Sequence, residues 1–183
     1  MIDPLPVTLV SIAMGLLLAG AAWHKSRSFA VFAAVLADYR LLPPNLVAPA
    51  ARLLPLAEAA LAIGWLSDRA RPFVAALTAG LFALYGVAIA VNLVRGRVHI
   101  NCGCGLGGES GADQLLSWSL VLRNALLVGL SLLPLLPVAQ RPLSALDYAT
   151  LGAALLTAAL LYFGAIQLMN NGAAMRAWRN PGD

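Results

Sequence analysis

The chain has 183 residues, a net charge of +4, and a composition that is 61% hydrophobic and only 11% charged. Soluble domains average about 45–50% apolar and about 25% charged residues, so these values exclude a typical water-soluble globule. The 12 Lys and Arg are scattered between apolar runs and form no stripe, which argues against a nucleic-acid partner. Length and composition together predict one domain of the all-α integral membrane class, whose solvent is the lipid bilayer.

Four apolar runs are long enough to cross a bilayer, for which a helix needs about 20 apolar residues. The expected spans are about 5–24, 72–94, 116–139 and 146–169. Pro72 suits the first turn of one span, and Ser144 with Asp147 resembles a capping box before another. We therefore expect helices to begin at these points.

A fifth, kinked span is expected at about 46–67, although Pro49, Arg52, Pro55 and Glu58 interrupt it. Its second half is too apolar for a solvated loop. Between the first two spans, the stretch at about 28–42 places aromatic and apolar residues at roughly helical spacing beside charged ones, which predicts a short helix at the membrane interface.

Tryptophans and small residues add detail to these spans. Each tryptophan falls near a span end, where its ring favours the headgroup layer: Trp23, Trp65, Trp118 and Trp178. Small residues four apart would let helix backbones approach closely. The pairs are Gly15 with Ala19, Ala76 with Gly80, and Gly86 with Ala90.

Basic residues predict the orientation of the chain. With five spans, one side receives eight of them and the other three. The first group is Lys25, Arg27, Arg40, Arg52, Arg95, Arg97, Arg176 and Arg179, and the second is Arg69, Arg71 and Arg141. This places the N-terminus outside and the loop at about 95–115 at the cytoplasmic face, provided that the interrupted second span crosses.

That loop carries the motif Cys102-Gly103-Cys104. Cysteines this close can form a strained disulfide, because Gly103 supplies backbone freedom and strain makes the bond easy to pass on. A redox pair is therefore the favoured interpretation. Two alternatives stay open, namely a metal site that also uses His99 and a pair of inert thiols, and a closed zinc site would need more ligands than these.

Polar residues near or inside the spans form the remaining candidates. Glu58 and Arg123 lie well inside spans, where a lone charge is costly, so we expect them to pair with each other in a structural or a functional role. Asn92 and Asn124 are expected to hydrogen bond between helices. His24 and Lys25 close the first span and are expected to snorkel to the interface.

An ordered set of motifs resembles the methylamine utilisation protein MauE family, part of the wider DoxX-like group of redox-associated membrane proteins. The set begins with His24-Lys25, the stretch Tyr39-Arg40-Leu41-Leu42-Pro43 and Leu54-Pro55-Leu56-Ala57-Glu58, and it ends with Cys102-Gly103-Cys104 and Trp118 with Arg123-Asn124. The resemblance covers about residues 5–135.

The resemblance implies a DoxX-like four-helix bundle core, with the last span as a fifth transmembrane helix, in the bacterial inner membrane. It also implies a helper in maturing an exported quinoprotein amine dehydrogenase, acting with a thioredoxin-like, MauD-like partner on the disulfide-rich small subunit. Cys102 and Cys104 correspond to the thiol pair, and Glu58, Arg123 and Asn124 to motif residues of unassigned role.

A chain with only two cysteines cannot relay electrons across a bilayer by thiol exchange alone. It must exchange with a partner at one face, or pass electrons to a quinone or another subunit. Two other function classes remain open: a non-catalytic membrane chaperone or scaffold, and a quinone- or lipid-binding subunit in which Glu58 and Arg123 are the sensitive positions.

Overall fold

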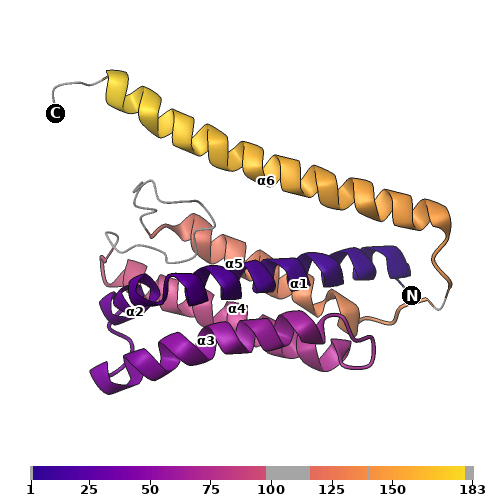
Figure 1. The fold of residues 1–183 in the computed structure, drawn as a ribbon, viewed down its shortest axis with the longest axis horizontal. Coiled ribbons are helices and arrows are strands. Elements are labelled where there is room, and N and C mark those ends of the chain that lie inside the picture. The colour runs from indigo at the N-terminus through magenta and orange to yellow at the C-terminus, as the bar shows by residue number, and fades with distance from the viewer. Residues whose placement is uncertain (1, 98–115, 140, 180–183) are drawn as a thin grey trace. The chain divides into compact units, whose positions relative to one another are not determined.

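The computed structural model of the chain describes residues 2–97, 116–139 and 141–179, and side chains of the last helix to Leu161 and at Gly164. Every regular element of these ranges is a helix (Figure 1). In chain order the elements are α1 (Pro4–Arg27), α2 (Phe29–Asp38), α3 (Pro44–Gly64), α4 (Arg71–Val94), α5 (Trp118–Leu132), the 3-10 turn η1 (Leu133–Leu135) and α6 (Ala145–Arg179).

Helix ends follow local chemistry. The Asp3 carboxylate accepts a hydrogen bond from the Leu5 amide at 2.9 Å and caps α1. Pro72 stands in the first turn of α4, as expected. Before α6, the Asp147 carboxylate accepts from the Ser144 amide at 2.7 Å, while the Ser144 hydroxyl accepts from the Asp147 amide at 3.3 Å. This reciprocal pair is the predicted capping box.

Four helices of the described ranges are long and apolar enough to cross a membrane: α1, α3, α4 and α5 continued through η1. The all-α membrane class is thereby confirmed. The expected kinked span at about 46–67 is α3, a helix of 21 residues that contains Pro49 and Pro55. α1 packs against α3 and α5, and α4 packs against the same two helices, so these four close into a bundle (Figure 1).

The N-terminus and the segment after η1 lie at the same end of this bundle. The Ile2 amide donates to the Pro137 carbonyl at 2.8 Å, and the Ala139 amide donates to the Ile2 carbonyl at 2.8 Å. Asp3 also forms a salt bridge with Arg141 at 2.8 Å. The chain therefore returns to its starting end after four passes through the bundle, which requires α3 to be one of those passes.

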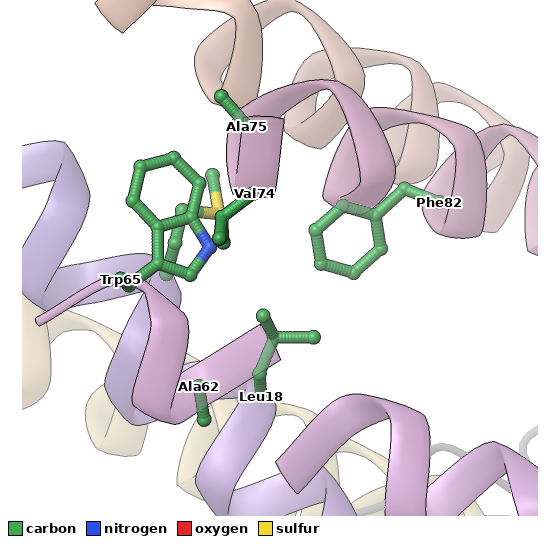
Figure 2. Close-up of a cluster of buried hydrophobic side chains, with 7 residues drawn as sticks. Leu18, Ala62, Trp65, Val74, Ala75 and Phe82 are labelled. Carbon is green, nitrogen blue, oxygen red and sulfur yellow. The ribbon is translucent and has the colours of Figure 1, made fainter. Parts of the chain in front are cut away.

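A hydrophobic core near this same end joins α1, α3 and α4 (Figure 2). Its largest member is Trp65, which directly follows α3, is 2% exposed and donates its indole N–H to the Thr78 hydroxyl at 3.1 Å. Trp65 thus marks the end of a span as predicted, but its ring is inside the protein and the headgroup placement was wrong. Trp23 and Trp118 are exposed.

Small residues have unequal roles along α4. A Cβ built on Gly86 would meet the Asn124 Cβ at 3.3 Å, so the α4 and α5 backbones approach closely there. A Cβ built on Gly80 would meet nothing within 4 Å among the described residues, and Ala76 is also exposed. The predicted packing role holds for Gly86 and is wrong for Gly80 within this part of the chain.

The remaining two helices differ from the bundle helices. α2 is short, and its residue Val35 and the following Tyr39 are buried in a second apolar cluster with Ile89 and Leu116. α6 belongs to a separate compact unit from the other helices. Its described apolar part, Ala145–Leu161, is shorter than a full span, so a fifth crossing stays a prediction.

Candidate functional site

Three polar side chains meet inside the bundle, one from each of α1, α3 and α4. The Lys25 ammonium forms an ion pair with Glu58 Oε1. The Tyr85 hydroxyl donates to the same Oε1 at 2.8 Å and accepts from Lys25 Nζ at 3.3 Å. We call these three residues the polar cluster. Each contact joins a different pair of helices, so the cluster holds three spans together.

The cluster is almost entirely withdrawn from the surface. The side chains of Lys25 and Glu58 are 5% and 1% exposed. Lys25 Nζ also lies 4.6 Å from the Tyr85 ring centroid and 5.2 Å from that of Phe32, so aromatic faces support the cation. Tyr85 is nine residues before Val94, where α4 ends, or about 14 Å along the axis at 1.5 Å per residue.

One oxygen of the cluster lacks a donor. Both donors converge on Glu58 Oε1, while Glu58 Oε2 is buried and has no hydrogen-bond partner among the described residues. An ionised carboxylate can accept at both oxygens, and a buried acceptor without a donor is unfavourable. The carboxylate therefore keeps one buried acceptor atom that no described residue satisfies.

This arrangement corrects two expectations. Glu58 pairs with Lys25 and not with Arg123. The Arg123 residue is exposed on α5. Lys25 does not snorkel to the interface but is 4% exposed inside the protein. The physical reason is the same for both: the lysine lies on the face of α1 that packs against α3, and a buried carboxylate needs a nearby cation.

The other predicted polar residues lie apart from the cluster's contacts. The Asn92 amide donates to the Ala88 carbonyl at 3.0 Å and the Asn124 amide donates to the Leu120 carbonyl at 2.8 Å, each within its own helix. Within the part of the chain that the structure describes, these intrahelical bonds stand in place of the expected interhelical ones. Asn92 Oδ1 is buried without a partner among the described residues. His24 is half-buried on α1.

The predicted thiol pair, Cys102 and Cys104, lies outside the described residues, as does His99. The chain that carries it connects Val94, the last residue of α4, with Trp118, the first of α5. Within ranges 2–97, 116–139 and 141–179, no group of three or more His, Cys, Asp or Glu side chains could hold a metal ion.

Sequence reasoning missed Tyr85. A signal was present, because it is the residue with a phenolic hydroxyl in the middle of a span that has no charged side chain between Pro72 and Val94. A buried tyrosine hydroxyl usually finds a hydrogen-bond partner. Hydropathy alone counts tyrosine among the apolar residues and so hides it.

Comparison with known proteins places the whole bundle in one family. A family profile described as "Methylamine utilisation protein MauE" matches residues 4–137, a range that includes the polar cluster and both cysteines. No solved structure matches the chain.

Individual relatives agree with the profile. A methylamine utilization protein MauE of Paracoccus denitrificans is 36% identical over 97% of this chain and 94% of its own length. One from Methylorubrum extorquens is 40% identical over 87% and 86%. One from Methylophilus methylotrophus is 48% identical over 56% of this chain and 54% of that relative.

Proposed function

Because the chain belongs to the MauE family of methylamine utilisation proteins, we propose that it is a membrane thiol-disulfide redox protein. In this proposal Cys102 and Cys104 exchange disulfides with a thioredoxin-like, MauD-like partner. The exchange assists maturation of the small subunit of an exported quinoprotein amine dehydrogenase.

One observation carries the proposal. The only two cysteines of the chain stand two residues apart in the segment that links α4 to α5, inside the family match. In this proposal the partner meets the chain where α4 ends and α5 begins. The glycine between the cysteines permits the tight ring that a disulfide here needs.

The chemistry follows thiol-disulfide exchange. One thiolate of the pair attacks a disulfide sulfur of the partner, and the partner's second sulfur leaves as a thiolate. The remaining cysteine then attacks the mixed disulfide, so the pair becomes a disulfide and the partner a dithiol. Electrons and protons balance between the two proteins, and the reverse direction uses the same steps.

The described helices support this role by holding the ends of the segment. α4 and α5 pack against each other, with the close approach at Gly86. Val35 of α2 and the following Tyr39 form an apolar cluster with Ile89 and Leu116. Arg95 is exposed just beyond α4. Basic side chains near a thiol stabilise its thiolate form.

Replacement of each cysteine tests the proposal. In a host that lacks its own copy of the protein, we expect Cys102→Ser with Cys104→Ser to lower the yield of mature amine dehydrogenase at least tenfold. One of the two single variants should accumulate a covalent adduct with the thioredoxin-like partner on a non-reducing gel, because the resolving sulfur is missing. Ser67→Ala, an exposed change between α3 and α4, serves as the control.

The second candidate function is a non-catalytic membrane scaffold for the same partners. The buried ion pair of the polar cluster favours it, since such a pair can fix how three helices meet without any chemistry. Wild-type maturation in the double serine variant would support the scaffold and reject thiol exchange.

A further inference from the structure

We propose that Phe32 of α2 is a positioning residue for thiol-disulfide exchange. The ring of Phe32 fixes α2 to the polar cluster, and α2 holds the end of α4 and the residues just before α5, which flank the two cysteines. The inference rests on the proposed function and deepens it, because it names a residue outside the cysteine-bearing segment on which exchange with a folded partner depends. Phe32 acts through two sets of contacts.

The first set attaches α2 to the spanning helices α1 and α3. Lys25 Nζ of the polar cluster lies 5.2 Å from the centroid of the Phe32 ring, and Phe32 is 9% exposed. One turn earlier, the Phe29 ring centroid lies 5.7 Å from the Arg52 guanidinium carbon of α3. Cations over aromatic faces are attractive, most of all where water is excluded. A helix of only ten residues is thus fixed by cations of its longer neighbours.

The second set attaches α2 to the chain on both sides of the cysteines. Val35 and the following Tyr39 are 8% and 7% exposed and form the second apolar cluster with Ile89 of α4 and Leu116. Ile89 lies close to the end of α4. Leu116 is 3% exposed, although it stands before the first residue of α5. α2 therefore packs against both helix ends between which the cysteine-bearing segment runs.

The turn that ends α4 connects this cluster to the direction in which the chain leaves the helix. Gly96 has a φ of 71° and donates its amide to the Leu93 carbonyl at 3.0 Å. The Arg97 amide donates to the Asn92 carbonyl at 3.0 Å, which completes a Schellman motif. Leu93 also packs against the apolar cluster that holds Val35. A shift of α2 would therefore move the turn from which the chain continues toward the cysteines.

A displacement of α2 should matter for a folded partner and not for a small disulfide. A folded partner reaches the thiols in one orientation, and a misplacement of about 1 Å caused far from the chemistry can slow a reaction on the order of a hundredfold. Glutathione disulfide is small enough to approach the same thiolate from many directions. Loss of partner exchange with retained glutathione exchange is therefore the signature of a positioning role.

The experiment uses the full chain in lipid nanodiscs with its cysteine pair reduced. Oxidation of the pair by the oxidised thioredoxin-like partner or by glutathione disulfide is followed by alkylating the remaining thiols at timed intervals. We expect Phe32→Leu, which removes the aromatic face, to slow exchange with the partner about tenfold or more and to leave the rate with glutathione disulfide unchanged. Phe32→Tyr, which keeps the ring face, should restore the partner rate.

Phe82→Leu is the matched control, because Phe82 is 4% exposed and belongs to the other hydrophobic core, with Trp65. It should lower the unfolding midpoint about as much as Phe32→Leu and leave both exchange rates unchanged. Leu116→Ala tests the other end of the contact path and replaces Phe32→Leu if that variant does not fold. Combining Phe32→Leu with Leu116→Ala should slow partner exchange no further than the slower single variant, because both act through α2.

An unchanged partner rate in Phe32→Leu and Leu116→Ala would overturn the inference, as would an equal loss of rate with the partner and with glutathione disulfide. Multiplied losses in the combined variant would also contradict it, since they indicate independent effects. If the wild-type pair exchanges with neither disulfide, the proposed function fails and the positioning role fails with it. If the wild-type pair exchanges with both and Phe32→Leu matches its rates, only the positioning role fails.

Discussion

At the residue scale, loss of either partner of the Lys25–Glu58 ion pair should strongly destabilise the bundle, because it leaves a buried charge unpaired. A lone charge well inside a membrane helix, where Glu58 lies on α3, costs at least about 2.5 kcal/mol unless a partner offsets it. Both side chains are at most 5% exposed, so neither can reach water if the other is removed. The pair is neutral as a unit, and the family match includes both positions.

Removing one member of the pair should destabilise the protein more than removing both. We expect Lys25→Met or Glu58→Met alone to lower the free energy of unfolding by about 3–5 kcal/mol, because each leaves a buried charge unpaired. The double variant should recover most of that loss, since two methionines fill similar volume without charge. Thermal unfolding midpoints in one detergent give the comparison. A double variant no more stable than either single variant would contradict this account.

Trp65 allows a second test at the residue scale. Its ring is 2% exposed and packs beside Val74, whereas Trp23 is 70% exposed. In variants that retain one tryptophan each, brominated lipids should strongly quench the fluorescence of Trp23 and quench that of Trp65 weakly. The reason is that quenching needs contact between the ring and the lipid chain. Equal quenching would place the Trp65 ring in contact with lipid and contradict its burial in the bundle.

At the scale of elements, apolar length predicted the long helices, while pairing between helices could not be predicted. The run at about 72–94 became α4 with nearly the same bounds, because proline and composition act locally. Pairing depends on which helix faces meet, and the sequence does not show this. The predicted partner of Glu58 was therefore Arg123, whereas its partner in the structure is Lys25. For the thiol pair no comparison between expectation and structure can be made, since Cys102 and Cys104 lie outside the described residues.

Two glycines of α4 allow the effect of helix packing on stability to be measured apart from the effect of helix propensity. Gly86→Leu should destabilise the bundle by about 1–3 kcal/mol, the usual cost of overpacking, because its Cβ already meets the Asn124 Cβ at 3.3 Å. Gly80→Leu is the matched control on the same helix, with nothing within 4 Å of its added Cβ. It should leave the unfolding midpoint unchanged or raise it, since leucine favours helix more than glycine does. Equal loss in both variants would argue against the close contact of α4 with α5.

At the scale of the whole molecule, the contacts between the N-terminus and the segment after η1 determine how many times the chain passes through the bundle. Ile2 and Val138 form a parallel bridge, and Asp3 binds Arg141. The sequence count of basic residues depended on whether the interrupted second span crosses, and hydropathy could not decide this. Long-range contacts resolve it, because only four passes bring Val138 back to Ile2.

Sidedness follows as a measurable consequence. With Cys102 and Cys104 replaced by serine, Ser67→Cys between α3 and α4 and Leu136→Cys after η1 should react with a membrane-impermeant maleimide from one side. Leu41→Cys between α2 and α3 should react from the other. All three positions are exposed, and they alternate between ends of the bundle after one, two and four passes.

The unequal distribution of basic residues between the two ends of the bundle predicts which end faces the cytoplasm. Arg27, Arg40 and Arg95 lie at the end that holds Leu41, so the positive-inside rule predicts labelling of Leu41→Cys only in inside-out vesicles. Because α4 ends and α5 begins at this same end, the thiols would face the cytoplasm, whereas maturation of an exported enzyme favours the opposite face. Labelling of Leu41→Cys in right-side-out vesicles would reverse the orientation and bring the thiols to the side where their proposed substrate matures.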